Sequence, residues 1–111
     1  MTDPVVEQLA AFNARDLERL LACYASGIVV ENGAGKKIVD GIDGMRVLCG
    51  KLFVDSPTLY AEVPTRIRAG DFVIDEQWVW GLNLPGFRSE MHAALVYRVH
   101  HGRIAHVRLL V

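Results

Sequence analysis

Apolar residues recur every three or four positions in the first quarter of the chain, a spacing that predicts helices. Asp3 and Pro4 suit a helix start, as the N-cap and the first helical residue. Residues 13–16 interrupt the apolar stripe, so we predict two consecutive helices, the second ending near residues 26–27. Another apolar stripe predicts a third helix over residues 45–53.

The remaining segments are rich in β-branched and aromatic residues, which favour strands. Turns that contain glycine separate them, and we predict strands over residues 28–32, 38–39, 59–69, 71–80, 88–100 and 103–111. Helices placed ahead of a run of hairpin-linked strands predict an α+β fold rather than a parallel α/β sheet. With 111 residues, the chain fits a single domain over residues 1–111.

The composition narrows the possible partners. The formal net charge is −1, so we expect no basic surface for nucleic acid or for an anionic membrane. Apolar residues make up 51% and charged residues 23%, as in globular proteins, and no apolar run approaches the roughly 20 residues of a bilayer span. The first residues carry no cationic segment, so we expect no secretory leader and a cytoplasmic location.

Neither a metal nor a cofactor is expected. Cys23 and Cys49 lie in predicted helices without CxxC spacing, which favours buried thiols over a disulfide or a zinc pair. The histidines have no recognisable ligand spacing. The loop at residues 33–37 contains glycine and lysine but matches neither a Walker loop nor GxGxxG, so we predict a flexible hairpin.

Several segments, taken together in their order along the chain, carry a family resemblance. They are the interrupted helices at residues 13–17, the strand and loop at 29–32, and the segments 41–46, 72–80 and 97–104. In this set the chain resembles the NTF2-like (SnoaL-like) superfamily. The resemblance implies a cone, in which a curved mixed or antiparallel sheet wraps around N-terminal helices. Members include ketosteroid isomerases, limonene epoxide hydrolases and polyketide cyclases, so the fold does not decide the chemistry.

The resemblance to ketosteroid isomerases implies positions for a carboxylate base, a tyrosine donor and a protonated aspartate. These positions fall on Asn32, on Gln8 and near Leu95. An asparagine amide cannot accept a proton near neutral pH, so the isomerase base is not retained.

The resemblance to epoxide hydrolases implies a water held by an asparagine, an arginine and two aspartates. Asn32 matches the asparagine, but the arginine position falls on Gln77. The aspartate positions fall on Val79 and Leu109, so this catalytic set is not retained either.

A polar cluster inside an otherwise apolar strand is the most informative feature for a site. Alternation puts Asp75 and Gln77 on one face of that strand, and Glu76, Trp78 and Trp80 on the other. If the register resembles that of the epoxide hydrolases, Asp75 and Gln77 point into the cone. If it resembles that of the isomerases, Glu76, Trp78 and Trp80 point into the cone. We favour the first set, although a slip of one residue would exchange them. A place in solvent or at a dimer face is the other alternative for these polar groups.

Three functions remain open, and whether the protein is an enzyme is not decided. The first is binding of a small apolar molecule in the cone. The second is an isomerase, cyclase or hydrolase with a rearranged acid-base pair, such as Asp75 with Tyr24 or His92, since burial favours a protonatable carboxyl group. The third is a structural homodimer with a filled cone. In each case we expect a homodimer through the outer sheet face with Trp78 and Trp80.

The candidate site residues follow from these faces and from the resemblance. We predict Asp75 and Asn32 as catalytic candidates. The predicted ligand-binding residues are Gln8, Phe12, Tyr24, Asn32, Met45, Cys49, Phe53, Asp75, Gln77 and Tyr97.

Overall fold

The computed structural model describes residues 3–111; Met1 and Thr2, on which the expectation about a leader partly depends, lie outside the described residues. Helices and strands follow the predicted order and form the expected α+β fold. The elements are α1 (Pro4–Ala14), α2 (Leu17–Leu21), β1 (Tyr24–Asn32), β2 (Lys37–Asp40), α3 (Ile42–Asp55), β3 (Tyr60–Ala69), β4 (Phe72–Trp80), β5 (Met91–His100) and β6 (Arg103–Leu110).

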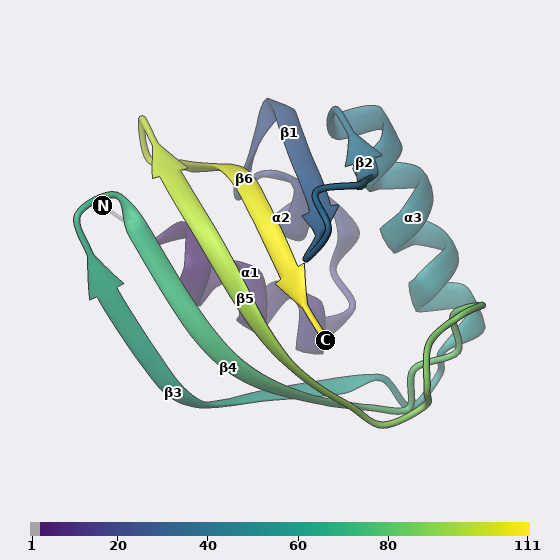
Figure 1. Cartoon of the computed structure of the whole chain (residues 1–111). Coiled ribbons are helices and arrows are strands. Elements are labelled where there is room, and N and C mark those ends of the chain that lie inside the picture. The colour runs from purple at the N-terminus through teal and green to yellow at the C-terminus, as the bar shows by residue number, and fades with distance from the viewer. Residues whose placement is uncertain (1–2) are drawn as a thin grey trace.

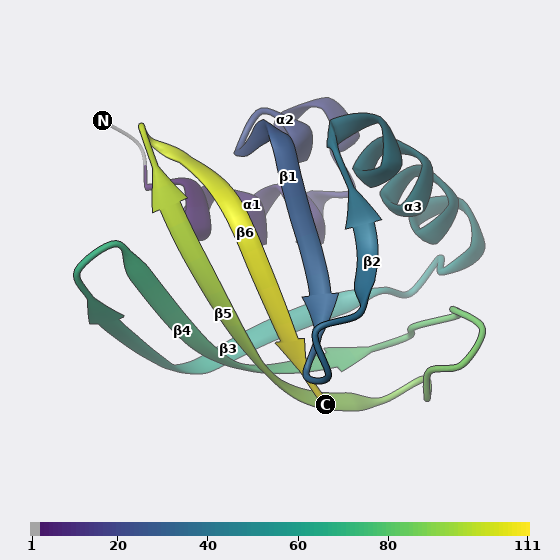
Figure 2. The ribbon, with the colours of Figure 1, turned by 45° about the horizontal axis from the view of Figure 1, so that its top comes forward.

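One curved, unclosed sheet carries the fold. Its strand order is β2-β1-β6-β5-β4-β3. Neighbouring strands are antiparallel except for β1 and β6, which run parallel. Helices α1 and α2 lie against the concave side of the sheet, and α3 lies beside β2 at one end of it (Figures 1 and 2). The expected curved mixed sheet around N-terminal helices is therefore confirmed.

The first two helices begin and end where their capping residues stand. Asp3 Oδ1 accepts a hydrogen bond from the Val5 amide at 2.9 Å, which confirms Asp3 as the N-cap of α1. Arg15 ends α1 with a left-handed φ of 58°, and the Asp16 side chain then caps α2. The predicted break between two helices is thus confirmed.

The predicted end of the second helix is wrong. Helix α2 ends at Leu21 and strand β1 already begins at Tyr24. The Ile104 amide donates to the Cys23 carbonyl at 2.9 Å, which draws this segment into the sheet beside β6. The apolar spacing of the helix continues into the strand because both elements bury side chains in the same core. Cys23 accordingly lies between α2 and β1 rather than in a helix.

Strand β4 has the register that we favoured from the sequence. Asp75 and Gln77 are buried on its concave face, between the equally buried Val73 and Val79. Ile74, Glu76, Trp78 and Trp80, which alternate with them, are half-buried on the convex face. Alternation and burial together therefore fix which side of β4 faces the cone.

The side chain of Asn13 joins helix α1 to the edge strand β3. Its Nδ2 donates to the Ala61 carbonyl at 2.9 Å, and its Oδ1 accepts from the Ala61 amide at 2.8 Å. The carboxamide thereby imitates a neighbouring strand at a point where Ala61 is only 1% exposed. It satisfies backbone groups that an uncovered edge strand would leave unpaired.

We expect Asn13→Ala to destabilise the fold by about 2 kcal/mol, because the buried amide and carbonyl of Ala61 lose their partners. Urea unfolding followed by circular dichroism measures this. The matched control is Asn83→Ala, which removes one exposed hydrogen bond to the Asp55 carbonyl and should cost less than about 0.5 kcal/mol. Equal losses in the two variants would contradict the role given to Asn13.

Candidate functional site

A cavity of about 170 Å³ lies between the helices and the concave face of the sheet. Its wall is almost wholly apolar, with side chains contributed by all three helices and by five of the strands. The polar groups that reach it are Gln8, Tyr24, Cys49, Gln77 and Tyr97. The lining contains no charged side chain among the residues that the structure describes.

Most of the residues predicted for ligand binding line this cavity. They are Gln8 and Phe12 of α1, Tyr24 of β1, Met45 and Cys49 of α3, Gln77 of β4, and Tyr97 of β5. On the helices, the spacing of three or four residues brings the side chains to one face. On the strands, alternation does the same.

The predicted placement of Asn32 and Phe53 in the pocket is wrong. Asn32 Oδ1 accepts from the Ala34 and Lys36 amides, both at 3.0 Å, and so closes the turn after β1. Phe53 lies behind the cavity wall, in an edge-to-face contact with Phe12 at 5.8 Å between ring centroids. Neither side chain lines the cavity.

Asp75 is buried inside the cone but does not line the cavity either. The Arg66 guanidinium donates to both carboxylate oxygens, from Nε at 2.7 Å and from Nη2 at 2.9 Å. This hydrogen bond raises the pKa of Arg66. Because a bidentate guanidinium occupies the carboxylate, Asp75 is not placed to act on a molecule in the cavity.

The other partners proposed for an acid-base pair are also separated from Asp75. His92 lies on the convex face, where its Nε2 is 2.8 Å from Glu76 Oε2 and its ring stacks on Trp78. The Tyr24 hydroxyl donates to Gln8 Oε1 at 3.3 Å. The predicted pairing of Asp75 with either residue is therefore wrong.

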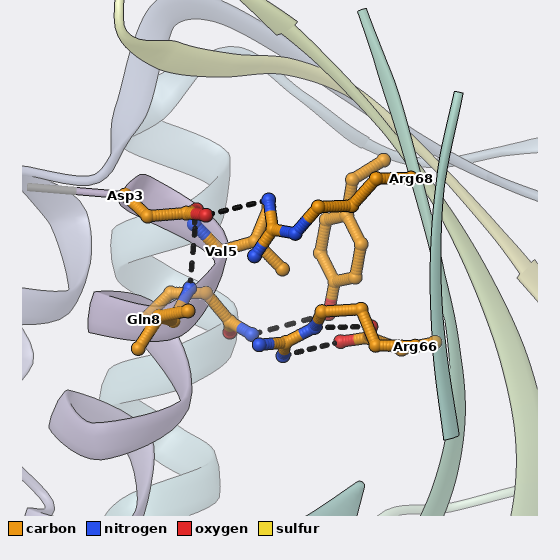
Figure 3. A network of polar contacts seen from close by, with 8 residues as sticks. Asp3, Val5, Gln8, Arg66 and Arg68 are labelled. Atoms are coloured by element: carbon orange, nitrogen blue, oxygen red, sulfur yellow. Dashed lines mark hydrogen bonds and ion pairs between the residues drawn. The ribbon is translucent and has the colours of Figure 1, made fainter. Parts of the chain in front are cut away.

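Arg66 and Arg68 reach from β3 toward the first turns of α1 (Figure 3). Arg68 Nη1 lies 2.6 Å from Asp3 Oδ2, so it binds the same side chain that caps the helix. Gln8 Nε2 in turn donates to the Tyr97 hydroxyl at 3.2 Å. The Arg68–Asp3 ion pair and the Gln8–Tyr97 hydrogen bond thus hold α1 on the sheet, while the Arg66–Asp75 pair joins β3 to β4 beside them.

The ionisable groups of the wall are neutral at physiological pH. Burial raises the pKa of the Cys49 thiol to about 11. It also raises the pKa of Tyr24 and, together with the nearby charge of Asp75, that of Tyr97. The cavity therefore offers hydrogen-bonding groups without charge.

Gln77 is the one lining side chain whose amide makes no hydrogen bond to another residue of the range 3–111. The residue is only 9% exposed. No completely buried side-chain nitrogen or oxygen of the described chain lacks a partner, so the Gln77 amide must reach open space. Since Gln77 lines the cavity, that space is the cavity.

The loop between β4 and β5 supplies lining residues that the sequence analysis missed. Leu82, Leu84 and Phe87 close one side of the cavity from this loop, which turns back beside α3 (Figure 2). At Gly81 the φ angle is 73°, and an added Cβ would stand 2.4 Å from the Thr58 carbonyl oxygen. Only glycine allows this close turn. The sequence signal that could have indicated these lining residues is the run of apolar residues among the glycines and the proline of segment 81–87.

The fold and the cavity together define a class of protein, namely a cone-shaped α+β protein that encloses an apolar internal space. The sequence model of the SnoaL-like domain matches residues 5–107, and the chain therefore belongs to the SnoaL-like domain family. The resemblance to the NTF2-like (SnoaL-like) superfamily is thereby confirmed. No curated protein sequence is significantly similar to the chain.

Solved structures share this fold over nearly the whole chain. An uncharacterised cystatin-fold protein from Novosphingobium aromaticivorans has a TM-score of 0.88 at 19% identity, covering 100% of this chain and 99% of that one. A hypothetical protein from Catenulispora acidiphila has a ketosteroid isomerase-like fold and is in complex with trimethylamine. Its TM-score is 0.75 at 15% identity, and the match covers 98% of this chain and 85% of that one. An LEH-like epoxide hydrolase from M. tuberculosis has a TM-score of 0.77 at 20% identity, and the match covers 96% of this chain and 78% of that one. At these identities the likeness is one of fold alone.

Two further features of the described chain bear on its partners. No helix within residues 3–111 is long and apolar enough to cross a membrane. The same residues contain no group of three or more His, Cys, Asp or Glu side chains arranged to hold a metal ion.

We expect the Arg66–Asp75 ion pair to stabilise the folded state, so that removing either partner lowers the free energy of unfolding. Arg66→Met leaves a carboxylate that is 0% exposed without its cation, and should cost about 3 kcal/mol. Asp75→Asn should cost less, because Arg66 is 21% exposed and can turn to water. In the double variant the losses should be clearly less than additive in urea unfolding. Additive losses would show that the pair is not coupled.

Proposed function

We propose that the protein binds a small, neutral and mainly apolar molecule inside the cone. The observation that carries this proposal is the amide of Gln77, which faces an apolar cavity without a protein partner. This amide is accessible and is engaged by no other residue of the described chain, so both its oxygen and its NH₂ group are free to hydrogen-bond a molecule in the cavity. The relative from Catenulispora acidiphila, which is in complex with trimethylamine, supports binding of a small molecule by this fold.

The size of the cavity limits the ligand. Apolar cavities of about 150 Å³ bind a single benzene ring. The cavity here, at about 170 Å³, suits one ring with a small substituent. The polar groups at its wall would orient such a molecule, and apolar contact would supply most of the affinity.

Binding is favoured over the enzymatic alternative because of what lines the cavity. An isomerase, cyclase or hydrolase would need a proton acceptor beside its substrate. Within residues 3–111, no carboxylate or imidazole lines the cavity. Binding is also favoured over a filled cone, since the cavity has room for a ligand.

We expect ring compounds such as toluene to stabilise the protein and a filled cavity to abolish this effect. At a hundred times its Kd, a ligand should raise the free energy of unfolding by about 2.7 kcal/mol. Cys49→Phe extends into the cavity and should remove the shift in melting temperature. The control is Val54→Phe, on the exposed side of α3, which should keep it. A toluene shift that survives Cys49→Phe would place binding elsewhere.

We also propose that two copies associate through the convex face of the sheet. Tyr60, Trp80, Trp78 and His92 form a continuous stack there, with ring centroids 6.3, 6.4 and 4.1 Å apart. Glu76 is already paired with His92 and accepts from Thr65 Oγ1 at 2.9 Å. A second copy would therefore meet an aromatic surface whose acidic group is already hydrogen-bonded, which suits a self-complementary two-fold interface.

We expect Trp78→Glu to convert the dimer to monomer, because each interface would then bring two new carboxylates together. Sedimentation velocity at tens of micromolar protein distinguishes the two states. Val54→Glu adds the same charge on α3, away from the sheet, and should leave the dimer intact. A wild-type protein that sediments only as monomer would refute the proposed interface.

A further inference from the structure

The polar groups of the cavity are not equally available to a ligand. Gln8 lies between the two tyrosines, accepting from the Tyr24 hydroxyl and donating to the Tyr97 hydroxyl. The guanidinium of Arg66 is held by both oxygens of Asp75. Gln77 alone presents a whole carboxamide to the cavity, so it decides which polar group a ligand can bring inside.

The surroundings of Gln77 leave room for that group. Its partner on β5 is Ala93, a buried residue with a small side chain. On β3, the register shifts between Glu62 and Thr65, opposite the same part of β4. The small side chain of Ala93 and the position of Gln77 in the cavity lining let the amide be approached from within the cavity.

From this arrangement we propose that the ligand carries an N–H donor directly bonded to a carbonyl group whose oxygen is the acceptor, as in a cyclic secondary amide (a lactam) or an imide. This inference rests on the proposed binding function and specifies the ligand of the same cavity. A carboxamide offers one acceptor oxygen and a donor NH₂ group in one plane. A lactam pairs with both at once, through its own N–H and its carbonyl oxygen.

Other polar groups fit this site less well. A ketone or ether accepts from the NH₂ group but leaves the Gln77 oxygen without a donor, and an unpaired buried group costs free energy. A carboxylate would bring a charge into an apolar space whose nearby cation is already engaged by Asp75. The site therefore selects a neutral ligand with both functions, and the apolar wall receives the rest of its ring.

Three seven-membered rings of similar size test this inference. They are ε-caprolactam with donor and acceptor, cycloheptanone with the acceptor only, and cycloheptane with neither. Each is titrated into the wild-type protein and into Gln77→Leu, with binding followed by NMR shifts of amides around the cavity. In the variant the affinity for caprolactam should fall at least about tenfold, and that for cycloheptanone by a smaller factor, while cycloheptane binds unchanged or tighter.

The outcomes separate this inference from the function on which it rests. If all three rings bind but Gln77→Leu weakens them by the same factor, or weakens none, the lactam preference is refuted while the binding function stands. If no ring binds the wild-type protein, the binding function itself fails. Should Gln77→Leu not fold, Gln77→Met, which is unbranched and close in volume, replaces it and must give the same order of losses.

Discussion

The ion pair between Asp75 and Arg66 allows this cone to contain a carboxylate and still enclose a neutral cavity. Asp75 is 0% exposed, and an isolated charge there would be strongly disfavoured. Arg66 comes from the neighbouring strand and approaches along the gap between β3 and α1 (Figure 3). Because the two charges neutralise each other behind the cavity wall, the polar groups left at the cavity are amides, hydroxyls and a protonated thiol.

The cavity also depends on elements that are far apart along the chain. The helices supply one wall, the concave sheet another, and the loop after β4 the third. That loop is tied down by the Asn83 amide, which donates to Ser56 Oγ at 2.9 Å, and by the close turn at Gly81. The apolar side chains of the loop therefore stay over the space even though the loop has no regular structure of its own.

Periodicity in the sequence was sufficient to predict the elements and much of the wall. Met45 and Cys49 follow from helical spacing. Alternation grouped Gln77 with Asp75 on one face of β4, and the resemblance to epoxide hydrolases favoured that face for the cone. The errors concern interactions that spacing does not encode. Asn32 was assigned by resemblance, yet its turn uses the side chain locally. The partner of Asp75 comes from another strand, and cross-strand pairs depend on a register that one strand cannot reveal.

The position of β6 has a consequence for how the molecule folds. This strand comes last in the chain order, yet it lies in the middle of the sheet, parallel to β1 on one side and antiparallel to β5 on the other. Until β6 docks, the β1–β2 hairpin and the β3–β4–β5 meander have no strand contact with each other. Contacts of such long sequence separation slow folding, because the loop entropy is lost before the pairing is gained. During synthesis, the pairing that joins the two halves of the sheet can therefore form only after β6 has left the ribosome.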